Sequence, residues 1–366
     1  MHDIEEFYLN MGPQHPSTHG VLKLVLKMDG EEVVEIKPEI GFLHRSLEKI
    51  AENRTYHQYI PYTDRLDYVT SMTSNLVYVT AVEKLAGIAV PRRAELIRII
   101  MAELNRIASH LLWLGAISLE TGATTPFLYV FREREYILDL FEMTCGARLT
   151  YNYMRIGGVS QDLPPGFREK AGDFLAYFRP CIKEYEDLLI NNIIFQQRTR
   201  GIGVLPLDTA ISYGVTGPSL RASGLRWDLR KNRPYSLYQE MEFEVPVRSS
   251  GDTLDRVLVR IEEMKQSCSI IEQAIEKLRK GEVRTPGISM NLRPPEGEVF
   301  VRTESPRGEI GCYIRSDGSP KPWRIKFRTP SFSHVSVLPH VLKGLLIADL
   351  VVAAGSFDIV LPETDR

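Results

Sequence analysis

Hydrophobic and polar residues alternate near the start of the chain. Leucine or methionine stands at every second position from 22 to 28, with lysine or valine between them. The dipeptide Asp29-Gly30, typical of tight turns, comes next, and Val34 and Ile36 continue the two-residue period beyond it. This pattern predicts a β-hairpin with one buried face.

Helical spacing dominates the long middle part of the chain. Beyond Pro91, apolar residues recur three or four positions apart, at Leu96, Ile100, Leu104, Ile107, Leu111 and Leu114. The same spacing runs through residues 254–278, between Asp252 and Gly281. Three more helices are expected at 64–85, 127–153 and 167–195, the last with a break or kink at Pro180. These segments predict a bundle of long helices.

The two-residue period returns after Pro294-Pro295. Stretches 299–303, 310–315 and 323–327 are separated by turn residues and predict a small antiparallel sheet, followed by a last helix over 338–354. The predicted fold class is therefore α+β, a long-helix bundle with small antiparallel β elements at the N- and C-terminal ends. We expect three parts that form one functional unit: 1–42, 43–290 and 291–366.

Composition argues against several classes of protein. The chain has 366 residues, 43% hydrophobic and 25% charged, with a net charge of −2 and no long basic run, so nucleic acid is not an expected partner. It has no run of about 18 uncharged apolar residues, so no membrane span is expected, and its acidic N-terminus does not fit a secretory signal. The four cysteines are widely separated and form no C-x-x-C motif, so we expect that this chain binds no metal. Free thiols of this kind are expected in a reducing cytoplasm.

The segment 12–20, Gly-Pro-Gln-His-Pro-Ser-Thr-His-Gly, holds two histidines in a loop. Pro16 lies between His15 and His19, so the pair is not a helical metal-ligand motif. An imidazole titrates at about pH 6.5, which suits proton delivery to a ligand. A rigid turn with histidines that have no chemical role fits the same spacing.

A second concentration of polar residues spans 59–75. Asp64 can cap the helix expected there, which is a structural role. Tyr68 is expected one turn inside that helix, with a buried ring and a hydroxyl that a ligand oxygen could satisfy. Glycine-rich nucleotide loops and the G-x-S-x-G motif are absent from the sequence, so function cannot be assigned from those motifs.

Several longer motifs occur in a fixed order along the chain. They are GPQHPSTHG at 12–20, GFLHR at 41–45, EKIAENRT at 48–55, YTDRLDY at 62–68, ELNRIASHLLWLG at 103–115, TPFLYVFRERE at 125–135, RIGGV at 155–159, GPSLRASGLRWDLRK at 217–231 and the terminal Asp365-Arg366. In these motifs the chain resembles, nearly end to end, the 49-kilodalton (D-type) family of respiratory complex I subunits. That family is related to the large subunit of nickel-iron hydrogenases, whose fold the resemblance implies.

The resemblance implies a peripheral-arm subunit of a proton-translocating quinone oxidoreductase, on the cytoplasmic side of the cell membrane. In that family, His19 and Tyr68 would match the residues that hydrogen-bond the two ends of the quinone head. His15, Thr18 and Glu120 would support the same pocket. Donors next to the quinone oxygens would stabilise the negative charge that two-electron reduction produces, and would then supply protons.

The resemblance also implies partners. Arg45 and Thr150 would lie near an iron-sulfur cluster held by an adjacent subunit, and the other expected partners are the C-type subunit and a membrane subunit with the quinone channel. The electron donor stays open between NADH, ferredoxin and another carrier. The two C-x-x-C motifs of hydrogenases are absent, which rejects hydrogen chemistry.

Three positions depart from the usual family pattern. Glu120 stands where an aspartate is common, Thr150 where many members have a histidine, and Ser46 where a glycine often follows the arginine. The loss of a titratable group at Thr150 is expected to lower the potential of the neighbouring cluster and to weaken its pH dependence. These departures leave a second hypothesis open, a scaffold or assembly subunit without catalytic residues.

Overall fold

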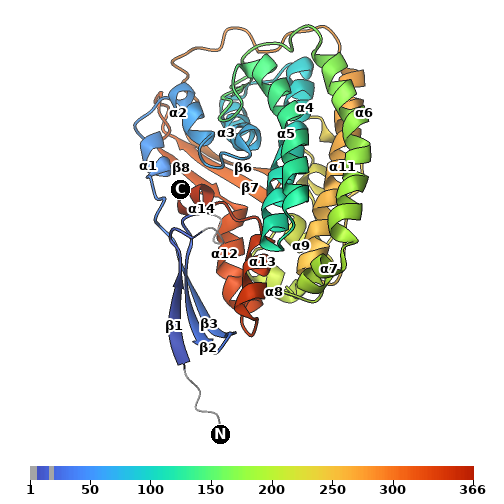
Figure 1. The fold of residues 1–366 in the computed structure, drawn as a ribbon. Helices are drawn as coiled ribbons and strands as arrows, with labels where there is room; N and C mark the ends of the chain where they lie inside the picture. Colours follow the sequence, from blue (N-terminus) through green and yellow to red (C-terminus); the bar gives the residue numbers. More distant parts are fainter. Residues whose placement is uncertain (1–5, 16–19) are drawn as a thin grey trace.

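Long helices form the body of the molecule, and short antiparallel sheets lie beside and below them (Figure 1). The computed structural model describes residues 6–15 and 20–366. This arrangement confirms the predicted α+β class. The strands are β1 (Glu6–Met11), β2 (Lys23–Asp29), β3 (Glu32–Glu39), β4 (Met154–Arg155), β5 (Gly158–Val159), β6 (Gly297–Ser305), β7 (Gly308–Ser316) and β8 (Arg324–Arg328).

The helices follow one another along most of the chain. The first seven are α1 (Leu47–Ala51), α2 (Tyr56–Thr63), α3 (Ser71–Ala86), α4 (Arg92–Glu120), α5 (Thr124–Cys145), α6 (Phe167–Tyr185) and α7 (Ile193–Thr199), with a π-turn at Glu186–Ile190. The remaining ones are α8 (Leu207–Ser212), α9 (Pro218–Ala222), α10 (Leu229–Asn232), α11 (Thr253–Lys277), α12 (Pro330–Val341), α13 (Ile347–Gly355) and α14 (Leu361–Asp365), with a 3₁₀ turn at Tyr238–Glu240.

Helix α4 is the centre of the bundle and packs against α5 and α11. The six apolar positions that predicted it are all buried. Each such leucine or isoleucine removed from water contributes roughly 1.5–3 kcal/mol. Helix α11 is also confirmed, and the Asp252 side chain caps it by accepting the Asp255 N–H at 2.8 Å.

Two predicted helix boundaries are wrong, and helix α6 does not break at Pro180. The helix expected from residue 64 begins at Ser71, because residues 64–70 form turns after α2. The helix expected to reach residue 153 ends at Cys145, where Gly146 adopts the left-handed conformation with φ 72°. Helix α6 continues through Pro180, which is exposed, so water can reach the carbonyl that the proline leaves without a donor.

The break in that region comes later, after the π-turn. The Asn192 side chain accepts the backbone N–H groups of Ile194 and Phe195 and so starts α7 as a separate helix. A capping residue therefore decides this boundary, although proline is the stronger helix breaker in isolation.

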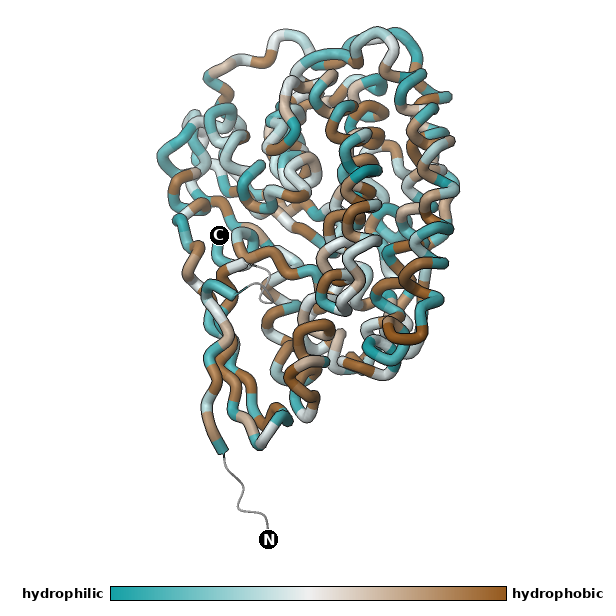
Figure 2. Tube along the Cα trace, in the orientation of Figure 1, coloured by the Kyte–Doolittle hydropathy of each residue, from teal (hydrophilic) through white to brown (hydrophobic). Residues whose placement is uncertain are grey.

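The N-terminal hairpin is confirmed as β2 and β3, and β1, which the sequence did not predict, pairs with β2. Hydrophobic and hydrophilic positions alternate along these strands in Figure 2. Their apolar face contributes Leu24 and Leu26 to a hydrophobic cluster shared with α12, α13 and the C-terminal segment. The N-terminal sheet thus packs on the end of the chain.

The C-terminal sheet is confirmed with the order β6-β7-β8, and α3 covers it. The single helix expected over 338–354 is wrong. The chain turns at Gly344, with φ 80°, and the Gly344 N–H donates to the Val33 carbonyl at 2.8 Å, so α12 and α13 are separate. The chain between α12 and α13 is therefore hydrogen-bonded to β3 and does not continue the helix. The division into parts 1–42, 43–290 and 291–366 stays a prediction.

Candidate functional site

The C-terminal segment 358–366 is the meeting point of several motifs, and Figure 1 shows α14 beside α1 and above the N-terminal sheet. The backbone N–H groups of Gly41 and Leu43 each donate to the Asp365 carboxylate at 2.8 Å. His44 Nδ1 lies 2.7 Å from the Asp365 carbonyl oxygen. Asp365 therefore fixes the loop that carries Arg45.

Asp67 connects the turn before α3 to the same segment. Its carboxylate accepts the Val69 N–H at 3.0 Å and receives Arg307 Nη1 at 2.6 Å. Arg307 also donates from Nε to the Asp358 carbonyl at 3.0 Å and from Nη2 to the Asp358 carboxylate at 3.2 Å. All three side chains are less than 9% exposed, so this is a buried ion triad.

Tyr68 follows Asp67 and lies outside any helix, with 45% of its surface exposed. The expectation of a buried ring one turn inside a helix is therefore wrong, because the helix starts three residues later. Partial burial raises the pKa of the Tyr68 phenol, and the negative charges of Asp67 and Asp358 raise it further, while Arg307 opposes them. The phenol keeps its proton at neutral pH and is accessible as a hydrogen-bond donor.

The loop 12–20 begins and ends in the described part of the chain, whereas Thr18 and His19 lie outside the described residues. Gly12 has φ 89°, and a Cβ there would lie 2.1 Å from the Leu22 carbonyl oxygen, so glycine is required for the chain to close on itself. His15 is exposed and forms a β-bridge with Gly20. A Cβ on Gly20 would lie 4.0 Å from Leu361, which places the end of the loop against α14.

Arg45 is exposed, and its Nη2 donates to the Arg65 carbonyl at 2.7 Å, three residues from Tyr68. Ser46, the next residue, has φ 56°, a conformation that glycine adopts without strain. This φ is one that the glycine implied at this position by the family resemblance would adopt without strain.

Asp64 does not cap α3, contrary to expectation: it follows α2 and is fully buried. Burial raises its pKa to about 7, against the opposing effects of Asn75, Arg65 and the Asn152 backbone. The segment that carries Thr150 therefore passes beside Asp64. Thr150 itself is half-buried, with φ 51°.

Glu120 is the last residue of α4 and is half-buried. Helix α4 is fixed to α13 by Trp113 Nε1, which donates to the Gly355 carbonyl at 2.8 Å. Among the contacts between described residues, none joins Glu120 to Tyr68. The structure thus brings the segments of Arg45, Tyr68 and Gly20 together on the C-terminal segment, and it leaves the role of Glu120 a prediction.

Sequence reasoning missed several acidic and basic residues behind this site. Glu363 is fully buried, accepts the Ser331 N–H at 3.0 Å and has its pKa raised to about 8, first by burial and then by the charge of Asp67. Arg307 and Asp358 were also missed. Asp67 and Arg307 are 240 residues apart, so no local signal could have paired them.

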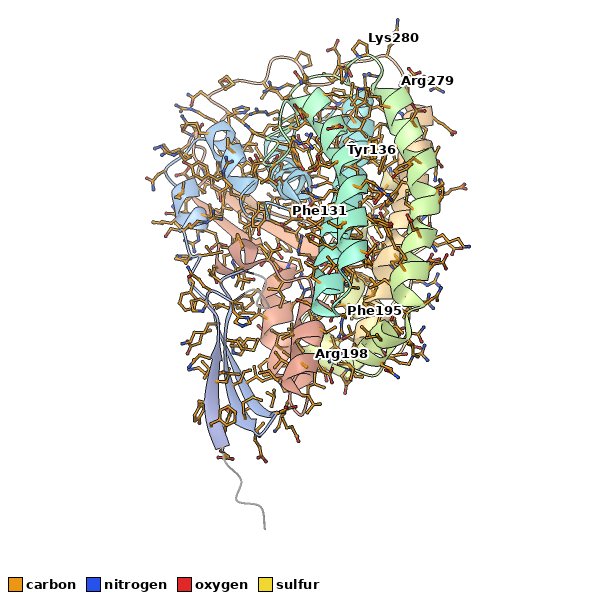
Figure 3. All side chains as sticks on the ribbon, viewed as in Figure 1. Phe131, Tyr136, Phe195, Arg198, Arg279 and Lys280 are labelled. Carbon is orange, nitrogen blue, oxygen red and sulfur yellow. The ribbon has the colours of Figure 1, made fainter. Side chains whose placement is uncertain are left out.

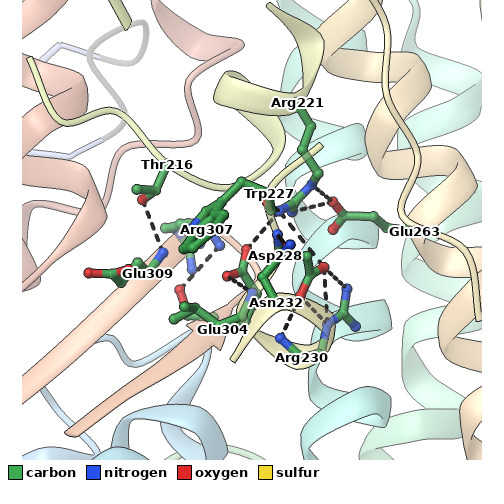
Figure 4. Close-up of polar contacts among 12 residues, drawn as sticks. Thr216, Arg221, Trp227, Asp228, Arg230, Asn232, Glu263, Glu304, Arg307 and Glu309 are labelled. Carbon is green, nitrogen blue, oxygen red and sulfur yellow. Dashed lines mark hydrogen bonds and ion pairs between the residues drawn. The ribbon is translucent and has the colours of Figure 1, made fainter. Parts of the chain in front are cut away.

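A second buried ion cluster gives a role to the motif at 217–231 (Figure 4). Arg221 donates to Glu304 at 2.8 Å and from Nε to Glu263 at 3.0 Å, and Arg230 pairs with Asp228 at 2.7 Å. Such a network specifies one arrangement of α4, α9, α11 and β6. Its members are Glu103, Arg106, Arg221, Asp228, Arg230, Glu263 and Glu304.

Two further findings concern the described residues as a whole. None of the helices in the described part of the chain combines the length and apolarity needed to cross a membrane. No group of three or more histidine, cysteine, aspartate or glutamate side chains within residues 6–15 and 20–366 is arranged to hold a metal ion.

A groove of about 410 Å³ between α5 and α6, lined by Tyr136 (Figure 3) and Tyr177, contains none of the predicted site residues.

Comparison with known proteins gives consistent matches. The family model described as "Respiratory-chain NADH dehydrogenase, 49 Kd subunit" matches residues 120–292 and 286–366. A protein of Bacillus mycoides strain KBAB4, named as the D-type subunit of NADH-quinone oxidoreductase, is 52% identical over 361 residues, and proteins of the same name from a Bacillus cereus strain and from Bacillus anthracis are 51% identical over 361 residues. Each alignment covers 99% of this chain and 99% of the relative.

Proposed function

Because this chain belongs to the family of 49-kilodalton subunits of respiratory-chain NADH dehydrogenase, we propose that it forms the quinone-headgroup pocket of a proton-translocating complex of that type. The relatives are named as parts of an NADH-quinone oxidoreductase, so quinone is the proposed substrate. The observation that carries the proposal is the convergence of Tyr68, the end of the loop 12–20 and the Arg45 loop on the C-terminal segment.

Tyr68 and His19 are the proposed hydrogen-bond donors to the two quinone oxygens. Reduction to the quinol adds two electrons and two protons, and the electrons increase the negative charge on the oxygens first. Tyr68 is suited to this role because it is part-exposed and its raised pKa keeps the phenol protonated until the charge appears. His15, Thr18 and Glu120 would shape the pocket.

Asp67 and Arg307 support Tyr68 from behind. Arg307 binds the Asp67 carboxylate at 2.6 Å, and that carboxylate accepts the Val69 N–H at 3.0 Å. The buried triad with Asp358 therefore holds the backbone of the 64–70 turn, which carries Tyr68, in one position. This backing allows a part-exposed side chain to be preorganised for its ligand.

The electrons are proposed to come from an iron-sulfur cluster in an adjacent subunit. Arg45 is exposed and anchored through Arg65, so it can present a fixed cation to a neighbour, and Thr150 lies on the segment that passes Asp64. The remaining proposed partners are the C-type subunit and a membrane subunit with the quinone channel. The protein would sit peripherally on the cytoplasmic side of the cell membrane.

The assembled complex with Tyr68→Phe or His19→Ala tests this proposal. We expect each change to lower quinone reductase activity by roughly 10²-fold or more, because a positioned proton donor is lost. The set of assembled subunits and electron transfer to an artificial acceptor upstream of the quinone should stay unchanged. The matched control is Tyr62→Phe, on α2 and stacked on Tyr59. Normal quinone turnover in both variants would reject the pocket and favour the scaffold hypothesis.

A further inference from the structure

A separate pocket of about 300 Å³ lies where α2, the β4–β5 hairpin and the irregular segment 278–296 meet. None of its lining residues belongs to the proposed quinone site. They are His57, Gln58, Arg155, Ser160, Arg284 and Met290. We call it the Arg155–Arg284 pocket.

Two glycines hold the arginines next to each other. A Cβ on Gly158, which has φ 151°, would lie 2.1 Å from the Val283 carbonyl oxygen, so only glycine lets segment 283–285 approach the hairpin. The Val159 N–H donates to the Val283 carbonyl at 3.0 Å, and the Thr285 N–H donates to the Gly157 carbonyl at 2.8 Å. Arg284 is thereby fixed opposite the hairpin that carries Arg155.

The two arginines have no counter-charge of their own. Among the described residues, no carboxylate lies within ion-pair distance of the Arg155 or Arg284 guanidinium, and neither side chain donates a hydrogen bond. Both are half-buried. Burial lowers the pKa of Arg155, and the charge of Arg284 lowers it further. Two cations that line one half-buried pocket repel each other, and a bound anion would relieve this repulsion.

The nearby titratable groups do not supply that anion. His57 cannot act as an anion; burial and the charges of both arginines lower its pKa and so favour its neutral form, and its Nε2 lies 3.1 Å from the Ser289 carbonyl. Asp64, which faces Arg155, has its pKa raised to about 7 by burial and is only partly ionised at neutral pH.

Two other carboxylates near the pocket are already paired, and a third, Glu282, is not among the lining residues of the pocket. Glu83, which accepts the Gly157 N–H, is bound by Arg98 at 2.6 Å, and Asp162 is bound by Arg93 at 2.7 Å. Glu282 is exposed and forms no ion pair within the described chain. The pocket therefore keeps a net positive charge.

The surroundings of the pocket favour a protein ligand over a small ion. Met290 on its wall is 70% exposed, an apolar side chain that a free ion would not cover. The segment 278–296 has four basic and two acidic residues, a net charge of +2 in a chain whose net charge is −2. Figure 3 shows Arg279 and Lys280 projecting at the end of the bundle where this segment begins.

We propose that the Arg155–Arg284 pocket binds a carboxylate of a neighbouring subunit, an acidic side chain or a C-terminus, and so forms a docking point of the complex. Each guanidinium offers a planar pair of N–H donors that matches the two oxygens of a carboxylate, and the second arginine adds a further positive charge in the same pocket. Met290 would pack on the apolar part of the same partner segment. The inference rests on membership in a multisubunit family and does not depend on where quinone binds.

The first test compares intact complexes that carry Arg155→Gln with Arg284→Gln, and Arg293→Gln as the control on the same exposed segment. The readout is the rate at which neighbouring subunits dissociate as salt is raised. We expect the double variant to dissociate at least about tenfold faster, because a desolvated charge pair is lost. The full chain carrying both changes should unfold at the same temperature as wild type or higher, since a repulsion is removed. Unchanged dissociation would overturn the proposal.

The second test identifies the occupant. A photoreactive amino acid is placed at Met290 in the intact complex, and the cross-linked peptide is sequenced. We expect one peptide of a neighbouring subunit with an aspartate, a glutamate or the C-terminus at the cross-link. Arg284→Glu combined with lysine at that partner acid should restore retention. A cross-linked peptide without a carboxylate, or no cross-link, would overturn the proposal. So would stabilisation of the intact complex by inorganic phosphate that the double variant abolishes, because the pocket would then be open to a free ion.

Discussion

Asp64 offers a sharp test of the electrostatics around the site. Its side chain has no exposed surface, and burial raises its pKa from 3.8 to about 7. A carboxyl with a raised pKa binds its proton more tightly in the folded state than in the unfolded state. Its favourable contribution is therefore fully present below about pH 4 and is lost as pH rises through about 7.

The magnitude follows from the shift. A difference of about 3 pKa units at 1.36 kcal/mol per unit corresponds to about 4 kcal/mol of stability lost between pH 4 and pH 8. Asp64→Asn keeps the shape of the protonated acid and removes the titration. We expect the variant to match wild type at pH 4 and to be more stable at pH 8 by up to about 4 kcal/mol.

Urea unfolding of the full chain at pH 4, 6 and 8 measures this directly. Asp173→Asn, at an exposed carboxylate on α6, is the control and should change stability by less than about 0.5 kcal/mol at every pH. A variant Asp64→Asn that is less stable than wild type at pH 8 would refute the reasoning. It would mean that the native carboxylate is charged and stabilised by a partner such as Arg155.

Two more changes test the core and the Arg45 loop. Glu103→Ala removes a fully buried carboxylate that binds both Arg230 and Arg106 and leaves one buried positive charge uncompensated in the cluster. It should lower the free energy of unfolding by about 3–5 kcal/mol in urea unfolding. Glu240→Gln at the exposed pair with Arg92 should lower it by less than about 1 kcal/mol. Ser46→Gly relieves the left-handed backbone and should raise the melting temperature by an amount equivalent to about 1 kcal/mol; a lower melting temperature would contradict this account of φ at Ser46.

The sequence predicted the elements whose signal is local. Helices α4 and α11 show a regular apolar spacing, and β2 and β3 alternate around Asp29-Gly30, so each was found. Boundaries failed where a distant contact or a single capping residue decided them. Gly344 is held by Val33 more than 300 residues away, and no pattern near residue 344 carries that information.

The candidate site also has residues that were predicted and residues that only the fold reveals. The resemblance supplied Tyr68, Arg45 and the loop 12–20, and the comparisons confirm the family. The residues behind them were not predictable, because their partners lie far away in the sequence. Arg307 on the turn between β6 and β7 and Glu363 near the C-terminus gain their meaning only when the fold places them beside Asp67.

Photolabelling of the assembled complex with a quinone that carries an azide on its ring tests the central claim most directly. The account predicts that the label attaches within residues 12–20 or 64–70 of this chain, and that excess unlabelled quinone removes it. Labelling confined to other subunits, or labelling of these segments that excess quinone does not reduce, would contradict the proposed pocket.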